Sequence, residues 1–327
     1  MAKANVLIPA YNPNLEWLQE LIQDLNKQDY NDFSVLFIDD GSKEPLDKDW
    51  VHRHLKVPFS IIRTSENHGI TSALNRGLAM NDSQFIIRMD ADDRMHPQRI
   101  SRQINFMESR PEIGACGSGA VRFGRRSHRF LIKEKHSEIM AELLFENPFC
   151  HPTLCFRQSA VKGLEYPSDV QQAEDYLFWS ILASKGVQFA NIPDILVGYR
   201  VSHSNSSSAT KAERFERYKA IQTSLYRNLF GDKISPEMLQ GIENGAHSCL
   251  GYVSSPKDVD VSSKTLDQHV QIVLETLSLR PDLFQDTAYL KDCLQKRAAI
   301  SSSMLATMIK KNFERFFVTG KQNWIKN

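Results

Sequence analysis

Short apolar runs alternate with amphipathic stretches along the first third of the chain. Continuous apolar runs of the buried-strand type predict strands at 6–9, 35–38, 59–62 and 85–89. Leucine and isoleucine recur at helical spacing between 15 and 25, and a further helix is expected over 70–79. This β-α-β-α order predicts an α/β fold with a mostly parallel sheet and helices on both faces.

The pattern changes after residue 204. Residues 204–208 form a polar, serine-rich break, and the sequence beyond them lacks convincing strand patterns. Helices are expected near 211–230, 236–250, 266–279 and 286–317. We therefore expect a first domain over 1–208 and a helical C-terminal region over 209–327, which would contact the acceptor, a membrane surface or another subunit.

The last stretch, 308–327, interleaves aromatic side chains with lysines and arginines and contains one acid, Glu314. Such a segment can lie on an anionic membrane surface. A docked terminal helix with a solvated basic face explains the same pattern, and sequence alone slightly favours this second interpretation.

Composition and charge narrow the class of protein. The 327 residues are 41% hydrophobic and 24% charged, which is ordinary for a soluble globular chain. A formal net charge of +1 gives no global field for nucleic acid, so no nucleic-acid partner is expected. The apolar runs are too short to span a bilayer and no signal-peptide pattern follows Met1, so we expect a cytoplasmic protein, with peripheral contact to the inner membrane as an option. The five scattered cysteines fit reduced thiols better than disulfides or a zinc site.

Polar clusters follow three of the expected strands. They are Tyr11-Asn12, Asp39-Asp40 and the acidic cluster Asp90–Asp93. Ligands of parallel sheets bind beyond the carboxyl ends of the strands, so these clusters should converge on one site. Asp39-Asp40 precedes Gly41, and an ordinary Asp-Gly turn explains that pair equally well.

Three carboxylates crowd the loop after the fourth strand. Asp90, Asp92 and Asp93 would repel one another unless a cation or hydrogen-bond donors neutralise them. Oxygen ligands suit Mg²⁺ or Mn²⁺, which also coordinate phosphate oxygens. The alternative is a solvated acidic turn in which Asp93 caps a helix that begins at Pro97.

A second acidic pair, Glu174-Asp175, opens an apolar helix. The helix dipole explains acids in a first turn without any catalysis, but a carboxylate there can also act as a general base beside a sugar site. The sequence contains no GxxxxGK[ST] loop and no HExxH, and residues 114–119 do not match GxGxxG.

Five motifs together resemble the family 2 glycosyltransferases of GT-A fold, which are Rossmann-like. The motifs are VLIPAYN (6–12), IDDGS (38–42), NHG (67–69), MDADD (89–93) and AEDY (173–176). The resemblance runs from about residue 4 to 208. Within the family the chain looks most like bacterial β-1,3-N-acetylglucosaminyl- or galactosyltransferases of lipo-oligosaccharide and O-antigen synthesis, with which it shares NPFxH (147–151) and YRxxH (199–203).

The resemblance implies a UDP-sugar donor, a saccharide or lipid-linked saccharide acceptor, and Mn²⁺ or Mg²⁺ as cofactor. It implies that Asp175 is the base and that Asp92 and His203 are metal ligands. Many relatives carry Arg where this chain has Leu74, so the corresponding contact to the nucleotide is either lost or supplied by Arg76. The residues implied to contact the nucleotide or donor sugar are Pro9, Tyr11, Asn12, Asp40, Asn67, Arg76, Asp90, Ala91, Asp93, Glu174 and Arg200.

The individual roles follow the same resemblance. Tyr11 would stack on uracil, Asp40 would accept the uracil N3–H, and Asp90 would bind the ribose. Asp93 would face either the metal or the donor sugar. The expected reaction inverts the anomeric carbon and gives a β-linkage.

Two other functions fit parts of the sequence. A GT-A-type nucleotidyltransferase would use the same sheet and metal, but residues 10–13 lack the glycine-rich basic loop of those enzymes. A non-catalytic sugar-nucleotide-binding protein would not need Asp92 and Asp175.

Overall fold

The computed structural model describes residues 2–124, 128–130, 132–168, 173–201 and 211–240, together with a few positions between 275 and 289. His203, the break at 204–208 and the segment 308–327 lie outside the described residues. Of the expected C-terminal helices, that over 211–230 is confirmed as α8 (Lys211–Phe230), and 236–240 is helical as expected.

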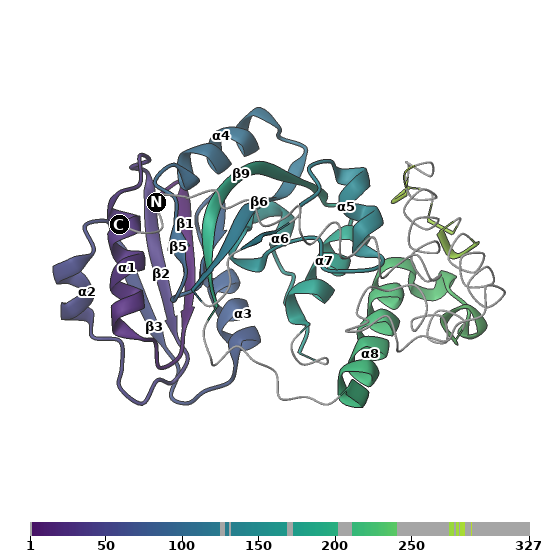
Figure 1. Cartoon of the computed structure of the whole chain (residues 1–327), viewed down its shortest axis with the longest axis horizontal. Coiled ribbons are helices and arrows are strands. Elements are labelled where there is room, and N and C mark those ends of the chain that lie inside the picture. The colour runs from purple at the N-terminus through teal and green to yellow at the C-terminus, as the bar shows by residue number, and fades with distance from the viewer. Residues whose placement is uncertain are drawn as a thin grey trace.

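A single twisted sheet runs through the molecule (Figure 1). Its strand order in the described residues is β3-β2-β1-β4-β8-β6-β9-β5, with β7 paired to β6. The strands are β1 (Ala4–Ala10), β2 (Phe33–Asp39), β3 (Phe59–Arg63), β4 (Phe85–Arg88), β5 (Arg94–Met95), β6 (Ile113–Gly124), β7 (His128–Arg129), β8 (Cys155–Arg157) and β9 (Gln188–Val201).

The expected parallel arrangement is confirmed for the four N-terminal strands. β3, β2, β1 and β4 pair in parallel, with Val6 opposite Val35 on one side and Ile87 on the other. Beyond them the sheet is mixed, because β8 inserts antiparallel between β4 and β6. β6 and β9 then pair in parallel along most of their length.

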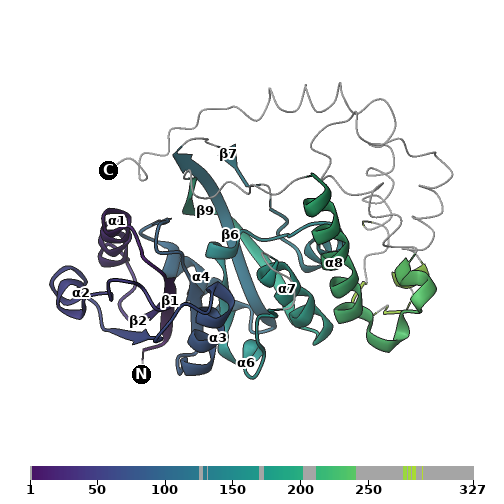
Figure 2. The ribbon, with the colours of Figure 1, turned by 90° about the horizontal axis from the view of Figure 1, so that it is seen from below.

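Helices cover both faces of the sheet, as expected. One hydrophobic cluster joins one face to α3, α5, α7 and α8, and a second joins the other face to α1, α2 and α4. Helices α2 and α8 lie at opposite sides of the molecule (Figures 1 and 2). The helices are α1 (Leu15–Asn26), α2 (Lys48–His54), α3 (Ile70–Met80), α4 (Arg99–Ser109), α5 (His136–Leu143), α6 (Gln158–Val161) and α7 (Glu174–Ser184).

Local sequence explains where the first helices begin. The side chain of Asn14 caps α1 by accepting hydrogen bonds from the N–H groups of Glu16 and Trp17, which lack partners inside the helix. Leu18 and Leu25, which belong to the apolar face of α1, are buried. α3 begins after Gly69, whose φ of 88° suits glycine.

The glycine-rich segment 114–119 lies inside β6. A Cβ on Gly117 would come within 2.1 Å of Asn191 Oδ1, and one on Gly119 within 2.9 Å of the Asp194 carbonyl oxygen. These glycines therefore allow β6 to approach β9 closely.

Helix α8 packs into the hydrophobic cluster on the α7 face of the sheet. Its Leu225, Leu229 and Phe230 are buried in the hydrophobic cluster that contains α7. We propose that the chain divides into a region 1–208, built on the sheet, and a helical region 209–327. Among the described residues, no helix combines the length and apolarity needed to cross a membrane.

A buried ion pair joins α1 to β5 directly after the acidic cluster in the chain. Arg94 donates from Nε and Nη2 to the two carboxylate oxygens of Asp24, at 2.6 and 2.9 Å. The backbone N–H of Met95 donates to the same carboxylate. Both side chains are about 5% exposed, so the pair fixes the chain where it leaves the loop after β4.

Replacing Asp24 with Asn should destabilise the protein by about 3 kcal/mol, because a buried guanidinium loses its countercharge. Urea unfolding measures this change. The half-exposed pair Arg102–Asp194 is the matched control, and Asp194→Asn should cost less than about 1 kcal/mol. Equal losses in the two variants would contradict the structural role given to Asp24.

Candidate functional site

The carboxyl ends of β1, β2 and β4 lie side by side, since β1 pairs with both other strands. Asn12 ties the loop after β1 to the loop after β2: its N–H donates to Ser42 Oγ, and its Oδ1 accepts from the Lys43 N–H at 2.8 Å. Asn12 holds a φ of 44°, which asparagine tolerates better than most residues. The predicted convergence of the polar clusters on one edge of the sheet is therefore observed.

The two aspartates after β2 are buried and shape the loops around them. Asp39 accepts hydrogen bonds from the N–H groups of Ser42 and Leu46. Asp40 accepts from Thr64 Oγ1 and from the N–H groups of His68 and Gly69, the last at 2.7 Å. Because Asp40 is 3% exposed, its carboxylate already organises the 64–69 loop before any ligand arrives.

The Asp-Gly turn is also present. Gly41 has a φ of 70°, and a Cβ there would lie 2.3 Å from the backbone of Glu66. The turn therefore needs glycine, and it packs the loop after β2 against the loop after β3.

The remaining residues assigned to the nucleotide differ in exposure. Tyr11 is 48% exposed, and Asn67, also exposed, accepts from the Gly69 N–H through its side chain. Pro9 is buried within β1. Arg76 lies on the exposed side of α3, whereas Leu74, at the position where many relatives carry Arg, is fully buried.

The acidic cluster brings three carboxylates together. One oxygen each of Asp90, Asp92 and Asp93 lies within 4.8 Å of the others. Burial and the neighbouring Asp90 raise the pKa of Asp92 to about 6, and the same two causes raise the pKa of Asp93 well above its usual range. Asp93 Oδ2 is buried and has no hydrogen-bond partner. Crowding, raised pKa values and an unpaired buried oxygen are what a divalent-cation site of this donor set would show.

The interpretation of Asp93 as a helix cap is wrong. α4 begins at Arg99 with Gln98 at the N-cap, and Asp93 Oδ1 instead accepts from the backbone N–H of Arg200 at 2.7 Å. Asp93 does not cap α4, because strand β5 lies between the two in the chain.

Arginines hold the acidic loop from several sides. Arg88 donates to Asp90 Oδ2 at 2.5 Å and is almost fully buried. Arg200 donates from Nε to the Asp92 carbonyl at 2.6 Å, pairs with Glu20, and lies over the rings of Trp17 and Phe123. Ala91, between the acids, is partly buried. The Arg200 guanidinium thus contacts the backbone of the loop that carries the acids.

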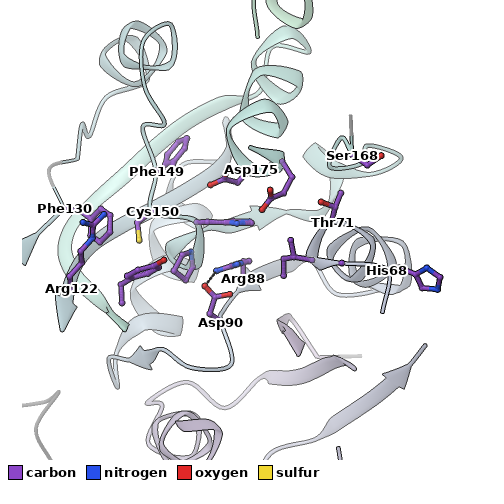
Figure 3. Close-up of a pocket in the computed structure, with 16 residues that line it drawn as sticks. His68, Thr71, Arg88, Asp90, Arg122, Phe130, Phe149, Cys150, Ser168 and Asp175 are labelled. Atoms are coloured by element: carbon purple, nitrogen blue, oxygen red, sulfur yellow. Dashed lines mark hydrogen bonds and ion pairs between the residues drawn. The ribbon is translucent and has the colours of Figure 1, made fainter. Parts of the chain in front are cut away.

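A cavity of about 740 Å³ opens beside this loop. Figure 3 shows Asp90 and Arg88 on one wall and Asp175 across from them. The cavity lining includes Asp90, Glu174 and Asp175 among the residues singled out from the sequence. The others assigned to the nucleotide or metal do not line it: Pro9, Tyr11, Asn12, Asp40, Asn67, Arg76, Ala91, Asp92, Asp93 and Arg200.

Asp175 is oriented by a chain of hydrogen bonds. Asn147 donates from Nδ2 to Asp175 Oδ2 at 2.7 Å and accepts through Oδ1 from the Trp179 indole N–H at 3.0 Å. Trp179 is fully buried, so it fixes which end of the Asn147 amide faces Asp175. Burial raises the pKa of Asp175, while the Tyr176 N–H, Asn147 and the positive charge of Arg88 oppose that rise.

α7 begins at Glu174, as expected, so the helix dipole also acts on this pair. Burial and the neighbouring Asp175 raise the pKa of Glu174. The dipole explains acids at this position, but it does not explain why both line the cavity beside Asp90.

Several cavity residues were given no role from the sequence. Arg88, Arg122 and Phe130 lie outside the quoted motifs, on β4, on β6 and directly after β7, and Tyr199 of β9 lies in the YRxxH segment without an assigned role. His151, although within the NPFxH segment, is buried, and burial lowers its pKa so that the ring is neutral at pH 7. Strand pairing between distant segments brings these side chains together.

Comparisons with known proteins agree with this geometry. Residues 5–164 match the model of glycosyl transferase family 2. The amylovoran biosynthesis glycosyltransferase AmsE of Erwinia amylovora is 29% identical over 230 residues, which cover 68% of this chain and 84% of AmsE.

Solved structures share the fold. TarS 1–349 of S. aureus in complex with UDP-GlcNAc has a TM-score of 0.60 at 17% identity, covering 91% of each chain. The mannosyltransferase PcManGT from Pyrobaculum calidifontis, in complex with GDP-Man and Mn²⁺, has a TM-score of 0.51 at 15% identity, covering 92% of this chain and 87% of its own. The α/β sheet is therefore the GT-A fold expected from the motifs.

One relative decides the family. An uncharacterized glycosyltransferase of Haemophilus influenzae is 31% identical over 208 residues, which cover 62% of this chain and 77% of the relative. With the family match over 5–164, this identity confirms the resemblance carried by the five motifs: the chain belongs to glycosyl transferase family 2, and it is a glycosyltransferase.

Proposed function

We propose that the chain is an inverting, divalent-metal-dependent glycosyltransferase that moves a sugar from a UDP-sugar to a hydroxyl of a saccharide or lipid-linked saccharide acceptor. N-acetylglucosamine is the favoured sugar, with galactose and glucose as alternatives, and the linkage is β-1,3. The observation that carries this proposal is the acidic cluster, with its unpaired Asp93 oxygen, beside a cavity whose opposite wall holds Asp175.

The relatives support the donor and the setting. TarS was solved with UDP and with UDP-GlcNAc, and AmsE is named for amylovoran biosynthesis. We place this chain accordingly in the synthesis of a bacterial surface polysaccharide, lipopolysaccharide, lipo-oligosaccharide or capsule. We also propose that it works in the cytoplasm, with contact between segment 308–327 and the inner membrane as an option beside a docked terminal helix.

The donor set of the acidic cluster fits Mn²⁺ or Mg²⁺, since it offers only carboxylate oxygens and leaves one of them unpaired. In this proposal Asp92 is the principal ligand, with Asp93 and His203 as further candidates. When bound, the cation would stabilise the negative charge that develops on the departing UDP. PcManGT, which shares the fold, was solved with Mn²⁺.

Asp175 is the proposed general base. A sugar hydroxyl is a weak nucleophile at neutral pH, so its proton must leave as the bond to the anomeric carbon forms. The buried carboxylate has a raised pKa, which makes it a stronger base than an exposed aspartate. Asn147 keeps one of its oxygens engaged and thereby aims the carboxylate.

On the donor side, Tyr11 would stack on uracil and Asn12 would hold the loop that carries it. Asp40 would contact the base from within the 64–69 loop that it organises, with Asn67 beside it. Asp90, Ala91, Glu174 and Arg76 are the remaining proposed donor contacts.

UDP should bind measurably more tightly with Mn²⁺ or Mg²⁺ than without, and Asp92→Asn should remove the difference. Titration calorimetry of UDP with and without Mn²⁺ tests this. Because protons compete with the cation for Asp92, affinity for Mn²⁺ should fall as the pH drops below about 6. Asp82→Asn, an exposed acid on the loop before β4, is the control. Metal-independent UDP binding that survives Asp92→Asn would refute the metal assignment.

Asp175→Asn should lower kcat on the order of 10²–10⁴-fold while UDP binding stays unchanged. Glu174→Gln is the neighbouring control, with an expected loss of less than about tenfold. Single-turnover measurement of UDP-sugar consumption reads both. If Glu174→Gln proves the more damaging variant, the base has been assigned to the wrong acid.

Asn147→Ala should shift the acidic limb of the kcat/KM pH profile toward higher pH. The Asn147 amide donates to the charged form of Asp175, so its removal raises the pKa of that carboxyl further. Asn147→Gln should restore part of the shift. An unchanged pH profile with lower kcat would show that Asn147 acts on the fold alone.

A further inference from the structure

One end of the cavity is built from β6, the β7 segment and β9. Arg122 lies opposite Tyr199 on β9 and opposite His128 on β7. The Phe130 N–H donates to the Ala120 carbonyl, which fixes Phe130 beside the same strands. Arg122, Phe130 and Tyr199 all line the cavity. Figure 3 shows Arg122 and Phe130 at the end away from His68, with Asp175 between them.

The charge of Arg122 has no counterion in the described part of the chain. No carboxylate of those residues lies within 4.0 Å of its guanidinium, and its buried Nε has no hydrogen-bond partner. Arg88 and Arg200, the other arginines near the site, pair with Asp90 and Glu20. A partly buried guanidinium without a countercharge is costly, so its presence in a cavity wall favours an anionic ligand.

Arg122 lies on an aromatic platform. Its guanidinium carbon is 4.6 Å from the centre of the Phe130 ring, and that ring meets Tyr199 edge to face at 5.8 Å. Burial and nearby Asp90 and Asp93 raise the pKa of Tyr199 to about 12, so its hydroxyl remains a neutral donor at physiological pH. An apolar ring face beside a hydroxyl and a cation suits a sugar ring that bears a negative group.

We propose that this end of the cavity is a subsite for an acceptor saccharide that carries a carboxylate or phosphate, with Arg122 as the residue that recognises the anion. The proposal rests on the proposed function, because it assumes that the acceptor hydroxyl faces Asp175. Charge determines which way the acceptor lies in the cavity. Glu174 and Asp175 repel an anionic group from the middle of the cavity, whereas Arg122 attracts it at the end.

The sequence around β6 and β7 also carries mostly positive charge. Between 122 and 135 the only acid is Glu134, against Arg122, Arg125, Arg126, Arg129, Lys133 and Lys135. Such an excess of positive charge in a chain of net charge +1 is typical of a segment that binds an anion.

The test uses the full chain saturated with UDP and Mn²⁺. Methyl β-D-glucuronide and glucose 6-phosphate serve as carboxylate and phosphate probes, and methyl β-D-glucoside as the neutral probe. Calorimetry or saturation-transfer NMR should show at least one charged probe binding about tenfold more tightly than the neutral one. Which charged probe binds better distinguishes carboxylate from phosphate.

Arg122→Gln should abolish that preference and leave UDP affinity and neutral-probe binding unchanged. Arg122→Lys should keep part of it, which guards against loss through misfolding. Arg53→Gln, which replaces an exposed arginine on α2 outside the cavity lining, should change nothing.

Equal binding of charged and neutral probes to the unaltered protein would overturn the proposal. A loss of UDP affinity in Arg122→Gln would also overturn it, because Arg122 would then bind the diphosphate. If UDP does not bind the unaltered protein at all, the proposed function itself fails, which is a different outcome.

Discussion

Mutual repulsion among three carboxylates in one short loop is the constraint around which this site is built. Asp90, Asp92 and Asp93 cannot stay close together and charged without positive groups around them. Arginines from three strands contact this loop or the residues next to it. Arg88 of β4 pairs with Asp90, and Arg94 of β5 pairs with Asp24 of α1 where the chain leaves the loop. Arg200 of β9 donates to the backbone carbonyl of Asp92. These contacts fix the backbone and leave one oxygen of Asp93 unpaired.

The second organising feature is the pairing of β6 with β9. It sets Val121 opposite Gly198 and builds one end of the cavity. The close approach depends on Gly117 and Gly119, whose missing side chains leave room for Asn191 and the Asp194 backbone. The same pairing brings Arg200 to the acidic loop and Tyr199 to the cavity, so one strand shapes both features.

Much of this could be predicted, and the limit is physical. Strands β1 to β4, helices α1 and α3, the polar strand ends and the helix at Glu174 follow from local periodicity and motif order, which a single sequence displays, whereas α2 and β5 were not expected. Phe130, Arg122 and Tyr199 could not be predicted as neighbours, because the register between distant strands depends on packing. Asp40 and Arg200 illustrate a subtler limit. Sequence motifs marked them as ligand contacts, and the structure shows that each also holds a loop in place.

Arg200 has a consequence for how the protein is made. Its contacts with Asp92, Asp93 and Glu20 join residues between 107 and 180 positions apart in the chain. β9 completes both the sheet and the acidic loop, and a domain generally folds as a unit. Neither the sheet nor the loop can therefore be complete on the ribosome before residue 200 has left the exit tunnel. The last strand and the acidic loop become ordered together, late in synthesis.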